Sequence, residues 1–159
     1  MLDTNDRIIV ELLDQQFDSL IEGLRALIGS TPSDLLYEQT AAVSIGENIL
    51  KSAGVIEQTF GGVTANLWDD PFEWTLPETL SNDTRILEYL VEVETLKKRA
   101  FASFANDSML LKLISIPSGE SCTLLELLFK TILRATDYRG RATATLKLLS
   151  GEDATRFII

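Results

Sequence analysis

Four long segments of this 159-residue chain repeat apolar side chains every three or four residues, the spacing of one face of an α-helix. They cover residues 4–28, 44–67, 82–104 and 123–150. No strong strand pattern, internal repeat or dividing linker accompanies them. Because helices of about 20 residues bury their apolar faces best against one another, we predict a single all-α domain over residues 1–159, built as a four-helix bundle.

Capping residues mark several helix ends. Ser44 with Glu47, and Thr123 with Glu126, have the spacing of a capping box, so they predict where the second and fourth helices begin. Gly29 predicts the end of the first helix. The predicted inner face of the first segment is Ile9, Leu12, Leu13, Leu20, Leu24 and Leu27. That of the second segment is Ile49, Ala53, Ile56, Phe60, Val63 and Leu67. That of the third segment is Ile86, Leu90, Val93, Leu96, Ala100 and Phe104.

Two connections differ in character. Residues 68–78 contain Trp68, Trp74 and two prolines, which predicts an ordered connection anchored by its aromatic rings. The adjacent glycines at 61–62 indicate a close backbone approach or a bend. Residues 106–121 are the least regular stretch. We expect extended chain at Met109–Leu111 and at Ile114–Ile116, followed by a turn at 117–119.

The chain contains no histidine and a single cysteine, Cys122. This composition excludes Ser-His-Asp and Cys-His catalysis, a histidine general base and histidine metal sites. One cysteine also excludes an internal disulfide and a thiolate zinc site within one chain. We interpret Cys122 as an ordinary small residue.

The charge balance disfavours several classes of partner. Fourteen Lys and Arg face 24 Asp and Glu, a formal net charge of −10. A protein that binds a phosphate backbone normally needs a basic stripe, so nucleic acid and anionic membrane surfaces are not expected partners. The start lacks a signal-peptide pattern, and no apolar run approaches the roughly 20 residues that cross a bilayer. We therefore expect a cytoplasmic protein.

One stripe of the last segment has apolar ends and a polar, basic middle. It consists of Leu124, Leu127, Thr131, Arg134, Tyr138, Arg141, Thr145 and Leu148. Arg134 and Tyr138 lie one helical turn apart on the same face. Such a patch lines a cavity when a facing helix supplies the other wall. The alternative is that Arg134 and Arg141 are solvated or paired with carboxylates of a neighbouring helix.

Two motifs resemble those of the DinB/YfiT-like superfamily: SIGENILK at 44–51 and RATDYRGR at 134–141. The resemblance implies a four-helix bundle of up-down-down-up order with a long second crossover, and frequent homodimers. Matched position by position, the metal-binding histidines of the family fall at Lys51, Arg134 and Tyr138. The Arg-Gly that follows them in the family is kept as Arg139-Gly140, and the next glutamine is replaced by Arg141.

All three ligand positions have changed in this chain. Lys51 and Arg134 have no lone pair to offer a metal at neutral pH, and together they would repel a divalent ion. The metal-dependent chemistry that the resemblance implies, namely thiol transfer, isomerisation or hydrolysis by metal-activated water, is therefore not expected. We expect no metal and no other cofactor.

Three hypotheses for the altered site stay open at this point. In the first, Lys51 and Arg134 pair with a carboxylate such as Glu47, Tyr138 donates to it, and the old site is a polar plug. In the second, the same cations and Tyr138 bind a small anionic ligand, which includes a metal-independent transferase or hydrolase. In the third, the chain is a helical protein-interaction module.

Other residues carry smaller predictions. Arg139 falls on the predicted inner face of the last segment, so it should meet a carboxylate or reach a dimer interface. The other members of that face are Leu125, Leu128, Ile132, Ala135, Ala142, Leu146 and Leu149. Gly140 lies inside a helix, which indicates close approach of a neighbouring helix. The apolar tail Phe157–Ile159, together with the resemblance, favours a homodimer. The acidic cluster Asp69, Asp70 and Glu73 is interpreted as an exposed turn.

Overall fold

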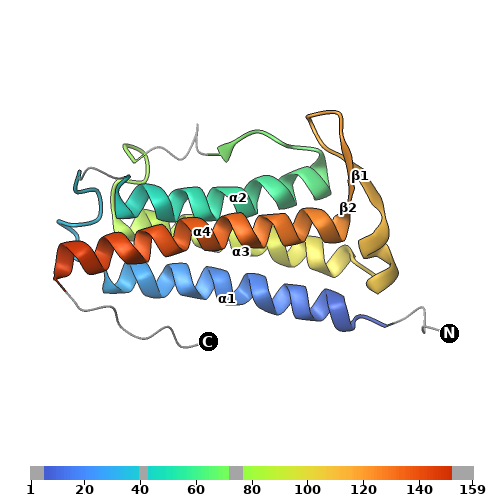
Figure 1. Ribbon diagram of the computed structural model, residues 1–159, viewed down its shortest axis with the longest axis horizontal. Helices are drawn as coiled ribbons and strands as arrows, with labels where there is room; N and C mark the ends of the chain where they lie inside the picture. Colours follow the sequence, from blue (N-terminus) through green and yellow to red (C-terminus); the bar gives the residue numbers. More distant parts are fainter. Residues whose placement is uncertain (1–5, 40–42, 72–76, 152–159) are drawn as a thin grey trace.

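The computed structural model describes residues 6–39, 43–71 and 77–151. These residues form an all-α structure whose long helices lie side by side (Figure 1). The long helices are α1 (Ile8–Ser30), α2 (Ile45–Ala65), α3 (Asp83–Ser103) and α4 (Leu124–Ser150). A 3-10 helix η2 (Asp107–Leu111) and a hairpin of strands β1 (Leu113–Ser115) and β2 (Ser121–Thr123) lie between α3 and α4 in the chain.

Each of the helices α1 and α2 packs mainly against α3 and α4, and only slightly against the other. Helix α1 packs against α3 and α4, and α2 packs against the same two helices, most extensively against α4. Followed from blue to red, α1 and α4 run in one direction and α2 and α3 run in the other (Figure 1). No described helix is long and apolar enough to cross a membrane.

The capping box at the start of α2 is confirmed. The Ser44 hydroxyl accepts from the Glu47 backbone N–H at 3.2 Å, and the Glu47 carboxylate accepts from the Ser44 backbone N–H. At α4 only half of the predicted box forms. The Thr123 hydroxyl accepts from the Glu126 N–H, whereas the Glu126 carboxylate pairs with Lys130.

Both ends of the first helix differ from the predicted range of 4–28. It begins at Ile8, continues past Gly29 and ends at Ser30. Ile9 and Leu12 are 43 % and 53 % exposed, so they do not belong to the inner face. The buried face is instead centred on Val10, Leu13, Phe17, Leu20, Ile21, Leu24, Leu27 and Ile28. Position 4 lies outside the described residues.

The beginning of α1 is capped from a distant part of the chain. The carboxylate of Asp107 in η2 accepts from the backbone N–H groups of Ile9 and Val10, at 3.0 and 2.9 Å. The Arg7 guanidinium donates to the carbonyl of Phe104 just beyond α3. These bonds satisfy helix-terminal groups that no local side chain reaches, and they tie α1 to the α3–η2 connection.

The segment after α2 folds back on the helix. Asn66 takes the left-handed conformation, with φ 56°, and ends α2 at Ala65. Leu67, predicted on the inner face, is therefore outside the helix and 61 % exposed. A Cβ at Gly62 would overlap the ring of Trp68, so the second glycine permits a close approach. Trp74 lies outside the described residues.

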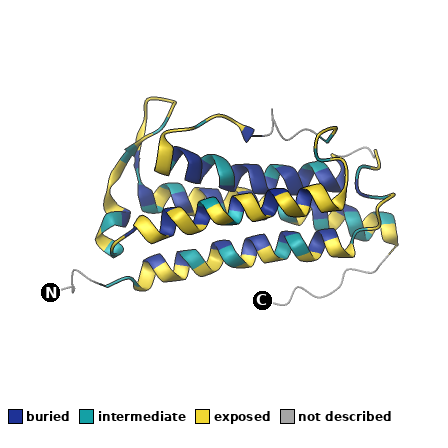
Figure 2. Ribbon diagram, turned by 180° about the vertical axis from the view of Figure 1, so that it is seen from behind, coloured by how far each residue is buried: buried dark blue, intermediate teal, exposed yellow. Residues whose placement is uncertain are grey.

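The irregular stretch is partly extended, as predicted. β1 pairs antiparallel with β2, and Gly119, with φ 85°, lies in the turn between them. Met109 to Leu111 are not extended, because they belong to η2. Figure 2 shows the buried residues on the inward-facing sides of the helices. The core includes an aromatic cluster in which Phe17, Phe60, Phe101 and Phe104 lie with ring centroids 4.9–5.8 Å apart.

Candidate functional site

A pocket of about 310 Å³ lies between α2 and α4. It is lined by Lys51, Gly54, Val55 and Gln58 of α2, Arg134 and Tyr138 of α4, and Asp70 of the segment after α2. The three positions matched to the family's metal ligands, Lys51, Arg134 and Tyr138, therefore meet at one pocket. Of the seven described lining residues, two are cationic and one is anionic.

The two helices that form this pocket are joined by neutral hydrogen bonds. The hydroxyls of Thr59 and Thr131 lie 2.6 Å apart, and the Ser52 hydroxyl donates to the Ala135 carbonyl at 2.7 Å. All three hydroxyl side chains are buried. Thr131 and Ala135 lie on either side of Arg134 in the sequence of α4. The two bonds therefore fix the position of Arg134 along the axis of α2.

The predicted polar plug, in which Glu47 pairs with Lys51 and Arg134, does not form with Glu47. Glu47 is engaged with Ser44 in the capping box, and among the described residues it is not part of the pocket lining. Arg134 is exposed, and within the described part of the chain it forms no ion pair. Arg134 therefore lines the pocket as an exposed cation with no ion pair to a described carboxylate.

Arg141 lies outside the pocket. It forms an ion pair with Asp137 at 2.7 Å, one turn earlier on α4, and both side chains are mainly exposed. Its guanidinium carbon lies 5.4 Å from the centroid of the Tyr138 ring. Arg141 thus touches the pocket only through Tyr138, and its own charge is already paired.

Arg139 and Gly140 require a correction. Gly140 is exposed, and no described part of the chain lies within 4 Å of a Cβ built there, so the expected close approach of a neighbouring helix is not found among the described residues. The close approach is at Gly23 of α1, where a Cβ would lie 2.7 Å from Nη1 of Arg139. Arg139 lies across α1 at that glycine and, among the described residues, forms no ion pair with a carboxylate. Its predicted alternative, a dimer interface, stays a prediction.

The acidic cluster divides between different surroundings. Asp69 and Asp70 are both exposed, as predicted; Asp70 in addition lines the α2–α4 pocket, which Asp69 does not, and Glu73 lies outside the described residues. Within the described residues no three Cys, Asp or Glu side chains come close enough to hold a metal ion.

The donor set of the α2–α4 pocket does not fit a divalent metal. Lys51 and Arg134 offer no lone pair to a metal ion. Asp70 is the single carboxylate among the described lining residues. Two fixed cations beside one carboxylate repel a divalent ion more than they attract it. We therefore derive no metal-dependent step for this pocket.

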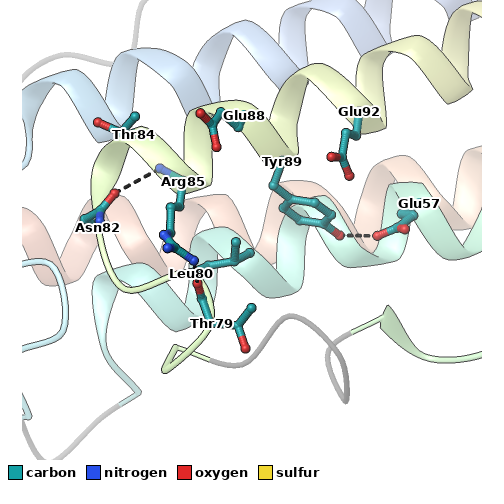
Figure 3. A pocket seen from close by; sticks show the side chains of 9 residues that line it. All are labelled: Glu57, Thr79, Leu80, Asn82, Thr84, Arg85, Glu88, Tyr89 and Glu92. Carbon is teal, nitrogen blue, oxygen red and sulfur yellow. Dashed lines mark hydrogen bonds between the residues drawn. The ribbon is translucent and has the colours of Figure 1, made fainter.

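A second, larger pocket of about 680 Å³ lies between α2 and α3 (Figure 3). Figure 3 shows the Tyr89 ring of α3 directed at Glu57 of α2, to which its hydroxyl donates a hydrogen bond. Glu88 and Glu92 line the same pocket from α3, with Arg85 near its other end. Sequence reasoning missed this pocket. The signal it overlooked is the run of Glu88 and Glu92 at helical spacing beside an aromatic residue.

Burial raises the pKa of Glu57, and the negative charge of Glu92 adds to the increase. The hydrogen bond from Tyr89 acts in the opposite direction. Among the described lining residues, the α2–α3 pocket has three carboxylates and one arginine, whereas the α2–α4 pocket has two cations and one carboxylate.

No family model matches this chain, and no curated protein and no solved structure matches it either.

Proposed function

We propose that this chain is a divergent, metal-free relative of the DinB/YfiT-like superfamily, an up-down-down-up four-helix bundle, and that it binds a small anion between α2 and α4. The observation that carries the proposal is the meeting of Lys51, Arg134 and Tyr138 at one pocket. The opposite directions of the α1–α4 and α2–α3 pairs support the family assignment.

The chemistry of the lining supports an anion. Arginine presents a planar fork of N–H donors that suits a carboxylate or a phosphate, and the charge of Lys51 reinforces it. Tyr138 adds one hydroxyl, and Arg134 has no competing ion pair among the described residues. We assign no reaction to the pocket. Binding is the function that these groups support directly.

The test is binding of acetate, succinate and inorganic phosphate to the purified chain, followed by calorimetry or by chemical shifts. We expect Arg134→Ala to weaken binding at least tenfold, since it removes the principal anion-binding group. Arg141→Ala is the matched control, because this arginine on the same helix is paired with Asp137 and lies outside the pocket; its effect should stay within twofold. Equal affinities for wild type and Arg134→Ala would contradict the proposal.

Restoring histidines tests the family assignment separately. We expect the variant Lys51→His, Arg134→His, Tyr138→His to bind one zinc ion tightly, because neutral imidazoles from two helices then converge. The wild-type chain should bind none stoichiometrically. Failure of the folded triple variant to bind zinc would argue against the position-by-position match.

We also propose self-association through an exposed apolar face of α1 and α4. Gly23 and Arg139 lie against each other, and α1 and α4 run in the same direction. Residues about ten positions earlier on each helix therefore lie at one end of the molecule. There Leu12 and Phe129 are 53 % and 57 % exposed. Light scattering should show a dimer that Phe129→Ser converts to monomer; a monomeric wild-type chain would remove this candidate.

A further inference from the structure

A third pocket, of about 670 Å³, lies at the end of the bundle where α2 ends and the β1–β2 hairpin lies (Figure 1). We call it the end pocket. The ends of α2 and α3, the segment after α2, η2, β1 and the first residue of α4 line it. It is separate from the α2–α4 pocket, because Lys51 and Gly62 lie about three turns apart on α2, or roughly 16 Å along its axis.

The described lining of the end pocket is largely apolar. Its large apolar side chains include Val63, Trp68, Phe104, Met109, Leu113 and Leu124. Leu113 is 69 % exposed, so part of this apolar lining is in contact with water in the free chain. A ligand with an apolar body would remove that surface from water, which is favourable. The volume is in the middle of the range of ordinary ligand sites, about 300 to 1,000 Å³.

The Trp68 ring forms a fixed wall of the end pocket. Its atoms lie where a Cβ at Gly62 would be, so the ring packs directly on the backbone of α2. Its Nε1 donates to Oδ1 of Asn66 at 2.9 Å, and the Trp68 carbonyl accepts from the Gln58 side chain at 2.8 Å. Because this wall is already in place, a ligand does not have to order it on binding, and that lowers the entropic cost.

Lys112 is the only charged side chain among the described residues that line the end pocket. No described carboxylate lines it, although the chain contains 24 Asp and Glu. Lys112 is exposed and forms no ion pair with a described residue. The charge of this lining therefore favours a ligand with a single negative group.

The helix ends indicate where that negative group would lie. The Leu124 backbone N–H donates to the Lys112 carbonyl at 2.9 Å, which places Lys112 beside the beginning of α4. The partial positive charge of a helix N-terminus adds to that of the ammonium. The ends of α2 and α3, on other walls of the pocket, have partial negative charges. An anionic group is therefore favoured beside Lys112, and an apolar group against Trp68.

We propose that the end pocket binds an amphipathic carboxylic acid, with its carboxylate beside Lys112 and its apolar body against Trp68, Phe104 and Met109. This site is distinct from the α2–α4 pocket, and the inference does not depend on the function proposed for that pocket. It explains why an apolar lining with one unpaired cation is kept in a strongly acidic chain.

The first experiment tests the apolar body with acetate, hexanoate, octanoate and decanoate, each below its micelle-forming concentration. The full chain contains two tryptophans, so Trp74→Phe leaves Trp68 as the single fluorophore, inside the end pocket. We expect decanoate to shift the emission of Trp68 to shorter wavelength and acetate to have no effect. Affinity should rise about fivefold or more for each two methylene groups added, because each buried methylene contributes to binding.

The second experiment tests the head group in the same single-tryptophan chain. Lys112→Gln should weaken decanoate about three- to fivefold and leave 1-decanol within twofold, since only the carboxylate interacts with the ammonium. Lys130→Gln is the matched control, because its ammonium pairs with Glu126 at 2.8 Å and does not line the end pocket. It should leave both affinities within twofold. Circular dichroism verifies that each variant is folded.

Three results would overturn the inference. Decanoate that leaves the emission of Trp68 unchanged does not bind in the end pocket. Equal affinities for hexanoate and decanoate would mean that the apolar lining is not used. A Lys112→Gln chain that binds decanoate as tightly as the Lys130→Gln control would mean that Lys112 does not hold the carboxylate. Arg134→Ala should leave decanoate binding within twofold; a loss as large as that of Lys112→Gln would place decanoate in the α2–α4 pocket, where it supports the proposed function and contradicts this inference.

Discussion

The α1–α3 interface and the α2–α4 interface use their cations in opposite ways. Between α1 and α3, Lys97 is 1 % exposed, and its ammonium donates to Asp14 and Asp18 at 2.6 and 2.5 Å. Between α2 and α4 the helices are joined by neutral hydroxyl bonds. There Arg134 lies beside a pocket and forms no ion pair among the described residues.

This contrast separates a structural cation from one that is available to a ligand. Burial alone would lower the pKa of Lys97, but the hydrogen bonds from its ammonium to Asp14 and Asp18 raise it above the ordinary value. Lys97 is therefore charged at neutral pH and committed to two carboxylates. Arg134 is also charged but forms no ion pair with a described carboxylate, so its guanidinium is available to a ligand.

The largest expected effect is that of Lys97→Ala. It removes a buried ammonium and leaves Asp14 and Asp18 facing each other without a cation, so the free energy of unfolding should fall by about 2–4 kcal/mol at pH 7. Urea denaturation measures it. Because the pKa of Lys97 is raised on folding, its contribution is complete below the unfolded value of about 10.4 and declines at higher pH.

The neighbouring Lys98 provides the control for this prediction. Its side chain is 66 % exposed, and its Nζ lies 3.7 Å from Oε1 of Glu94, which is a long distance for an ion pair. Lys98→Ala should therefore cost less than about 0.5 kcal/mol of unfolding free energy. If Lys97→Ala were no more destabilising than Lys98→Ala, the ion pairs of Lys97 would not be structural, and the contrast between the two interfaces would disappear.

A smaller effect is expected at the α2–α4 interface. Thr131 already donates its hydroxyl hydrogen to the Leu127 carbonyl, so Thr59 is the donor in the bond between the two threonines. Thr131→Val leaves the buried Thr59 hydroxyl without that acceptor and should cost about 1–2 kcal/mol. Thr59→Val removes the donor itself and should cost less. Equal or reversed costs in urea denaturation would contradict this direction.

Acid should weaken the α1–α3 interface selectively. The hydrogen bond from Arg25, at 2.6 Å, lowers the pKa of Glu94, and burial only partly opposes it. Since the folded pKa is depressed, the contribution of Glu94 is present above the unfolded value of about 4.3 and is lost as the pH falls through the folded value. Glu94→Gln should cost about 0.5–1 kcal/mol at pH 7.

The same variant tests the pH dependence. The difference in unfolding free energy between wild type and Glu94→Gln should shrink as the pH falls below the unfolded value of about 4.3, and close once the pH has passed the lower pKa of the folded carboxylate. Glu88→Gln, an exposed glutamate of the same helix, serves as the control and should show no such closure. A difference that is independent of pH would mean that the ion pair is not its source.

Local signals in the sequence predicted most of the fold. The helical spacing and the caps at Ser44 and Thr123 located α2 and α4, and α3 matches its predicted range within one residue at each end. The beginning of α1 was misjudged, since its cap, Asp107, is almost 100 residues away in the chain. No local pattern contains that information.

The charged residues were harder to predict. Lys51, Arg134 and Tyr138 were selected by resemblance, but Asp70 joins them only because the segment after α2 folds back. Lys97 was missed, although it continues the steps from Leu90 and Val93 better than the predicted Leu96, which is only half-buried. A lysine on an apolar stripe is a signal for a buried ion pair, and its partners on α1 depend on which helices become neighbours.

The smallest expected effect is the one that decides what Arg134 does. If Arg134 is a ligand-binding residue, Arg134→Ala in the absence of ligand should change the free energy of unfolding by less than about 0.5 kcal/mol, because an exposed cation without an ion pair contributes little to stability. Its stability should also show the same pH profile as wild type, measured by urea denaturation from pH 4 to 9. A loss comparable to that of Lys97→Ala would mean that Arg134 stabilises the α2–α4 interface as Lys97 stabilises α1–α3. The two cations would then have the same role, and the polar plug would be the better account of the pocket. A negligible loss, together with weakened anion binding, leaves ligand recognition as the role of Arg134.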